Sequence, residues 1–164
     1  MTENDEPAAP SHVDFAELQI QKLYVKDVSF EAPQSPQAFL QEIKPSVEVH
    51  LDSRTTRLGD NVHEVVLAVT VTVKSEDNVI YLVEVQQAGV FTLQGVPADQ
   101  LGPVLATACP TILFPYAREV VSDLVTRGGF PPLLLAPVNF DALYARDLER
   151  RQSESEAGAK QVTH

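Results

Sequence analysis

The spacing of apolar residues changes once along this chain, near residue 97, and the change separates two kinds of structure. Before that point apolar and polar side chains alternate, which is typical of β-strands with one buried face. After it, apolar residues recur every three or four positions, which is typical of a helix. We therefore expect an α+β protein in which a sheet comes first and helices follow.

Four strands are predicted in the first part, over residues 18–30, 47–55, 63–74 and 79–93. Polar turns at residues 58–61 and 75–78 join the last three strands into an antiparallel meander. A long connection containing Pro33, Pro36 and Pro45 separates the first strand from the second. Alternation along the first strand predicts that one face receives Leu23, Val25, Asp27, Ser29 and Glu31, and that the other receives Ile20, Tyr24, Val28 and Phe30.

Residues 101–127 predict one long helix, with Asp99 as its N-cap. Pro110 and Pro115 lie inside this helix and favour a kink, because each removes a backbone hydrogen bond. The apolar residues of the helix form two adjacent stripes rather than one. Such a helix is suited to burial between the sheet and a partner subunit.

A shorter C-terminal helix is predicted over residues 141–152, capped by Asn139 or Asp141. The folded domain is therefore expected to span residues 15–152. Residues 1–14, which are acidic, and residues 153–164, which are small and polar, are expected to be disordered tails. Neither tail contains enough apolar surface to offset the entropy of ordering it.

Charge and composition exclude several classes of function. The formal net charge of −11 disfavours binding to nucleic acid and favours basic protein partners. No apolar run approaches the ~20 residues of a membrane helix, and the N-terminus lacks a signal peptide pattern, so we expect a cytoplasmic protein without direct membrane insertion. The single cysteine and the spacing of the histidines predict no disulfide, metal site or cofactor.

Catalytic motifs are absent from the sequence: it contains no phosphate-binding loop, nucleophile elbow or paired helical histidines. Cys109 is expected to be a buried apolar residue rather than a nucleophile. Asp27, Glu31 and Glu84 are compatible with a solvated strand face, an acidic contact surface or an acid–base pair. The aromatic residues beside the irregular segments either cover the core or line a groove for an extended peptide.

Four segments resemble the SecB family of protein-export chaperones: IQKLYVKDVSFEAP (20–33), EVQQAGVF (84–91), CPTILFPYARE (109–119) and GGFPPLLLAPVNFDALY (128–144). They occur in the same order as in that family and extend over residues 20–144. The resemblance implies a cytoplasmic chaperone that keeps unfolded precursor proteins competent for export and delivers them to the SecA ATPase, without catalysing a reaction. It also implies a dimer of dimers in which the long helices pack at the interface between the dimers.

The resemblance assigns site residues in three groups. The SecA-binding surface would contain Asp27, Glu31, Leu82 and Glu84, and any zinc there would belong to SecA. The groove for unfolded clients would contain Phe39, Phe130, Phe140, Leu143 and Tyr144. Contacts within the homotetramer would involve Val83, Val85, Gln87, Ile112, Tyr116 and Val120.

One alternative is a small-ligand-binding or protein-interaction module without chaperone activity. A monomeric state together with stoichiometric binding of a small molecule would favour it. An enzyme is a more distant alternative, which would require a cleft with two perturbed acids around Glu84.

Overall fold

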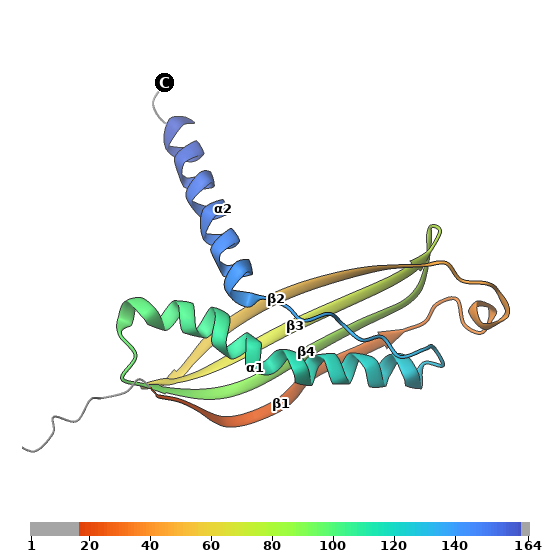
Figure 1. Ribbon diagram of the computed structural model, residues 1–164, viewed down its shortest axis with the longest axis horizontal. Helices are drawn as coiled ribbons and strands as arrows, with labels where there is room; N and C mark the ends of the chain where they lie inside the picture. Colours follow the sequence, from red (N-terminus) through yellow and green to blue (C-terminus); the bar gives the residue numbers. More distant parts are fainter. Residues whose placement is uncertain (1–16, 162–164) are drawn as a thin grey trace, which may run out of the picture.

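The computed structural model of the chain describes residues 17–161 (Figure 1). In it the alternating segments form one antiparallel sheet, and two helices follow the sheet in sequence. The four strands are β1 (Glu17–Glu31), β2 (Pro45–Gly59), β3 (Val62–Ser75) and β4 (Asn78–Gln94). The helices are α1 (Ala98–Arg127) and α2 (Phe140–Gln161). The predicted α+β class is confirmed, while the tail predicted at residues 1–14 lies outside the described residues.

The strand order is β1-β4-β3-β2, so the meander of β2, β3 and β4 is confirmed and β1 pairs with the last strand. Tight turns join the meander, and Asn61 and Glu76 in these turns have the positive φ angles that short hairpins require. Residues 32–44, with the 3-10 turn η1 (Gln37–Leu40), cross from one edge of the sheet to the other. This is a Greek-key connection.

β1 does not alternate as the sequence predicted, because two β-bulges interrupt its pairing with β4. The extra residues are Gln21 and Lys26. Because of the extra residue at Lys26, Leu23 and Val25 lie on one face of the sheet, whereas Asp27, Ser29 and Glu31 lie on the other. The prediction that these five residues share one face is therefore wrong.

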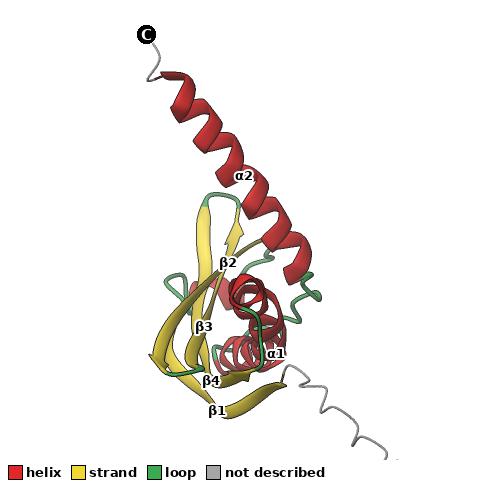
Figure 2. Cartoon of the chain, turned by 90° about the vertical axis from the view of Figure 1, so that its left-hand side faces the viewer, coloured by secondary structure: helices red, strands yellow, loops and turns green. Residues whose placement is uncertain are grey.

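α1 covers one face of the sheet, which we call the helix-covered face, and both helices lie on this side (Figure 2). β3 and β4 contribute alternate apolar residues to this core, and α1 contributes its buried stripe. Burying each such Val or Leu stabilises the fold by about 1.5–3 kcal/mol. The core residues with 0% exposure include Val65, Leu67, Val69, Val71, Val83, Val85, Phe91, Leu113, Ala117, Val121 and Val125.

Three prolines lie inside α1, at positions 103, 110 and 115, and its ribbon bends part-way along (Figure 1). The helix begins two residues earlier than its predicted cap allows: Pro97 occupies the N-cap position and Asp99 lies in the first turn. There the carboxylate still interacts favourably with the helix dipole. Gly128 ends the helix and donates its backbone N–H to the carbonyl of Leu124.

α2 begins beside α1 and then projects away from the sheet (Figures 1 and 2). The predicted cap is confirmed, since Asn139 Oδ1 accepts a hydrogen bond from the backbone N–H of Ala142 at 3.0 Å. The helix continues to Gln161, so residues 153–161 are helical where we expected a disordered tail. Neither described helix is long and apolar enough to cross a membrane.

Candidate functional site

The sheet face opposite α1, which we call the open face, brings the predicted acidic residues together. The second bulge of β1 places Asp27 opposite Gln86 and Glu31 opposite Leu82. Glu84 lies between them on β4, opposite Ser29. Asp27 and Glu31 are exposed, and Leu82 and Glu84 are half-buried. The four residues that the resemblance assigned to one surface therefore lie side by side on the open face.

β2 adds two acids to this surface that sequence reasoning did not assign to it. Glu48 pairs with Thr72 and Asp52 with Ala68, which directs both carboxylates to the open face. The signal for them was the alternation in residues 47–52, in which the polar positions fall on one side. We call the whole set the acidic patch: Asp27, Glu31, Glu48, Asp52, Leu82 and Glu84.

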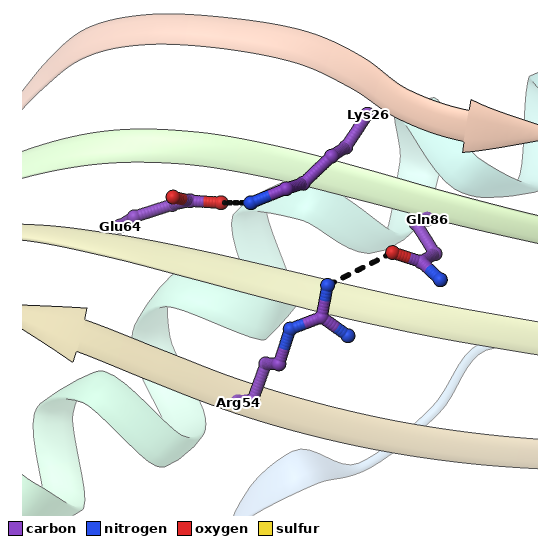
Figure 3. Close-up of polar contacts among 4 residues, drawn as sticks. All are labelled: Lys26, Arg54, Glu64 and Gln86. Carbon is purple, nitrogen blue, oxygen red and sulfur yellow. Dashed lines mark hydrogen bonds and ion pairs between the residues drawn. The ribbon is translucent and has the colours of Figure 1, made fainter.

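Two cross-strand contacts mark one boundary of the acidic patch (Figure 3). Lys26 Nζ lies 2.5 Å from Glu64 Oε1, and Arg54 Nη2 donates to Gln86 Oε1 at 2.9 Å. The hydrogen bond from Lys26 is the main cause that lowers the pKa of Glu64 below its usual value. Burial, and then the charge of Glu64, raise the pKa of the Tyr24 phenol beside it. Glu64 is thus neutralised by Lys26. Within the acidic patch Lys74 Nζ lies 3.4 Å from Glu48 Oε1, so the negative charge without an ion pair among the described residues belongs to Asp27, Glu31, Asp52 and Glu84.

An aromatic cluster formed by Phe30, Phe39, Tyr81 and Phe130 connects the crossover segment to the sheet. Ring centroids are 5.2 Å apart between Phe39 and Phe130 and 4.9 Å apart between Phe130 and Tyr81. Phe39 is 50% exposed, whereas Phe130 is 7% exposed. Phe39 is therefore accessible to a ligand, and Phe130 supports it from the core.

The other predicted groove residues lie at a different place, where α2 meets β2. A groove of about 660 Å³ there is lined by Phe140, Leu143 and Tyr144 together with Leu51 and Leu105. Phe140 is buried against Phe114. The five predicted residues thus occupy two separate sites, and we call the second the α2 groove.

Several exposed apolar residues near these sites were not predicted. Leu40 in η1 is 85% exposed and Leu134 in the loop before α2 is 78% exposed. Val47 and Val49 lie on the helix-covered face of β2 and are about half exposed. Strand alternation marked these valines as one face, but only the structure shows that this face extends beyond the cover of α1.

The predicted tetramer residues fall into an exposed and a buried group. Tyr116 is 49% exposed, and Ile112 and Val120 are half-buried on the same helix. In contrast Val83, Val85 and Gln87 are at most 3% exposed within one chain. The buried group cannot reach a second subunit directly, so any effect it has on assembly must act through the residues that cover it.

Cys109 is fully buried in the core, and burial raises the pKa of its thiol to about 12. A thiol in this state is a poor nucleophile. Among residues 17–161, no group of three His, Cys, Asp or Glu side chains is arranged to hold a metal ion.

Comparison with known proteins gives consistent matches over most of the chain. A family model described as "Preprotein translocase subunit SecB" matches residues 12–151. A protein of Nitrosococcus oceani named "Protein-export protein SecB" is 58% identical over 151 residues, which cover 91% of this chain and 90% of that protein. A protein of the same name from Methylococcus capsulatus is 56% identical, covering 84% of this chain and 88% of that protein.

A solved structure supports the fold independently. A SecB-like chaperone of Mycobacterium tuberculosis, in complex with a ChAD peptide from the HigA1 antitoxin, superimposes with a TM-score of 0.57 at 20% identity. The match covers 74% of this chain and 88% of that chain. At this identity the likeness concerns the fold alone.

Proposed function

This chain belongs to the SecB family and acts as a SecB chaperone in protein export, and on that premise we propose how its surfaces are used. The exposed apolar sites around Phe39 and the α2 groove hold unfolded precursor proteins. The acidic patch binds the SecA motor, to which the precursor is delivered. The chain itself works as a cytoplasmic homotetramer and catalyses no reaction.

Client holding rests mainly on one observation, the apolar surface that remains exposed in the folded chain. Phe39, Leu40, Leu134, Val47 and Val49 are all 46–85% exposed, although α1 and the loop after it are close by. Exposed apolar patches mark interaction sites in proteins. An unfolded segment provides apolar side chains along its length, whereas a folded protein has buried most of its own. The peptide bound to the M. tuberculosis chaperone is an example of a peptide ligand in this fold.

Substitution of Leu134 by serine tests client holding. Leu134 is 78% exposed, so the change should leave folding intact while it weakens the binding of a urea-denatured precursor. Binding is measured by fluorescence anisotropy of the labelled precursor during dilution from urea, with the native form of the same precursor as the control. Equal affinity for denatured and native precursor would refute the proposal.

SecA docking is supported by charge and by exposure. The acidic patch contains five carboxylates on one face of the sheet, contributed by β1, β4 and the far edge strand β2, and no described helix covers that face. Such a surface attracts a basic segment and steers its approach. The apolar side chain of Leu82 between the acids provides a contact that does not depend on charge.

Assembly is supported by a second apolar area. Ile20, Val25 and Val28 on the edge strand β1 are each 43–48% exposed, on the face where α1 presents Tyr116. A single chain leaves this area and the backbone edge of β1 unpaired, which favours association with a second copy. Measurement of solution mass by light scattering tests this, and a monomeric mass would contradict it.

A further inference from the structure

Two apolar anchors fix β1 on either side of its second bulge. Leu23 lies opposite Gly89 and packs against the core. Phe30 lies opposite Val83 and approaches Gly128 so closely that a Cβ atom there would overlap the Phe30 ring. From Leu23 to Phe30, β1 makes seven residue steps where β4 makes six. One extra residue must therefore lie between the anchors, but the anchors do not decide where.

The position of the extra residue decides which face receives Asp27. With the bulge at Lys26, Asp27 lies opposite Gln86 on the open face. If the bulge moved beyond Asp27, alternation from Val25 would direct the Asp27 carboxylate to the helix-covered face. Glu31 would not move, because Phe30 fixes it from the neighbouring position. Asp27 is thus the one acid of the patch whose placement depends on the bulge.

Gln87 contacts the backbone at the bulge. Its Nε2 donates to the carbonyl oxygen of Tyr24 at 3.2 Å, beside the pair formed by Val25 and Gln87. The side chain is 3% exposed, and its Oε1 has no hydrogen-bond partner among the described residues. An unsatisfied buried acceptor is destabilising, so an apolar residue of similar size would suit this position better if packing were its only task.

We infer that Gln87 is a positioning residue: its buried amide holds the extra residue of β1 at Lys26 and thereby keeps Asp27 in the acidic patch. The same placement leaves Lys26 free to reach across β4 to Glu64. Gln87 acts from the helix-covered face on a surface that it does not touch. The inference deepens the proposed docking of SecA and rests on it for its functional consequence.

Three variants of the full chain test the inference: Gln87→Met, deletion of Lys26, and the two combined. Methionine keeps the length of the side chain but cannot donate to Tyr24. Deletion of Lys26 makes the two strands equal in length between the anchors, so that no bulge remains to be placed. Asp27→Asn provides the comparison for loss of this carboxylate alone. The register is followed by backbone NOEs between β1 and β4 in deuterated protein, and docking by affinity for purified SecA.

We expect Gln87→Met to lose the NOEs between Asp27 and Gln86 and to bind SecA as weakly as Asp27→Asn does, by roughly threefold for one exposed ion pair. Adding Asp27→Asn to Gln87→Met should weaken binding no further, because both remove the same contact. Deletion of Lys26 should restore both the NOEs and the affinity in the Gln87→Met background. A packing role for Gln87 does not predict such a rescue. If Gln87→Met alone fails to fold, recovery of its fold by the deletion is the expected result.

If Gln87→Met keeps the NOEs between Asp27 and Gln86, the inference is overturned. It is also overturned if the combined variant binds SecA no more tightly than Gln87→Met does, while deletion of Lys26 alone leaves binding at the wild-type level. If the NOEs change as expected but the wild-type chain has no affinity for SecA, the docking function is refuted and the positioning role of Gln87 stands.

Discussion

Charge reversal at Glu84 should weaken SecA binding and leave the chaperone otherwise intact. Glu84 is central in the acidic patch, with Asp27 and Glu31 on the neighbouring strand two positions to either side of Ser29, its cross-strand partner. Diagonal neighbours of this kind are about 7–8 Å apart. Replacing Glu84 by lysine removes one attraction for a basic segment and adds one repulsion.

The size of the effect follows from the exposure of the site. An exposed ion pair contributes about 0.2–1 kcal/mol, so loss of one pair and creation of one repulsion of similar size together cost about 0.4–2 kcal/mol. This corresponds to a decrease in affinity of roughly two- to thirtyfold. Glu84→Gln, which only removes the attraction, should have about half of this free-energy effect. The fold should be preserved, because a lysine at this position would be surrounded by carboxylates.

Isothermal titration calorimetry with SecA measures the change, and Asp77→Lys is the matched control. Asp77 is an exposed acid in the turn between β3 and β4, so its reversal changes the net charge equally without altering the patch. The difference between the two variants should shrink at high salt, since the Debye length falls from about 10 Å at 0.1 M to about 3 Å at 1 M. Equal affinities for Glu84→Lys and Asp77→Lys would refute the assignment of this face to SecA.

Three further predictions concern the fold. Gly128→Ala should lower the free energy of unfolding, measured by urea denaturation, by about 1–3 kcal/mol because the added Cβ would clash with Phe30. The control Gly158→Ala, which adds a Cβ in open space on α2, should be neutral or slightly stabilising. Equal effects of the two substitutions would contradict the packing of Phe30 against Gly128. Cys109, with a thiol pKa raised to about 12 by burial, should resist alkylation at pH 8 in the native chain and react once unfolded; rapid native labelling would contradict its burial. Because Lys26 lowers the pKa of Glu64 in the folded state, this carboxylate stabilises the fold above the ordinary glutamate pKa, and the contribution disappears as pH falls through the lowered value. Glu64→Gln should therefore be less stable than wild type at pH 7, by no more than about 1 kcal/mol, and equally stable in strong acid; a difference that is independent of pH would exclude this cause.

Most of the fold was predictable because its signals are local. Apolar alternation located all four strands, and the change of period located α1. The C-terminal limit of α2 was not predictable, since residues 153–159 are exposed and continue the helix only along its own axis. The bulge at Lys26 was also not predictable: the packing of Leu23 and Phe30 against distant parts of the chain requires one extra residue in β1, and we infer that the contact of Gln87 with Tyr24 fixes its position.

The candidate sites were likewise predictable where their signals are local and not where they depend on packing between distant parts of the chain. The members of the acidic patch on β1 and β4 were assigned from the family resemblance, although the predicted alternation of β1 was wrong across the bulge, and Glu48 and Asp52 on β2 were not assigned to it. The aromatic residues were correctly associated with irregular segments, but the sequence does not determine which ring is exposed. Phe39 is accessible, whereas Phe130 and Phe140 are buried. The two buried rings flank the loop 131–139 and fix its two ends to the core, Phe130 through Tyr81 and Phe140 through Phe114.

The central claim is that one chain holds an unfolded precursor on its apolar sites and passes it to SecA through the acidic patch. The most direct measurement adds SecA to a preformed complex of the chaperone with a labelled, denatured precursor and follows both the mass and the label by size-exclusion chromatography with light scattering. We predict that the label first elutes with the chaperone tetramer and then with SecA, and that Glu84→Lys captures the precursor but transfers it poorly. Failure to capture the denatured precursor, or transfer that is unaffected by Glu84→Lys, would contradict the account.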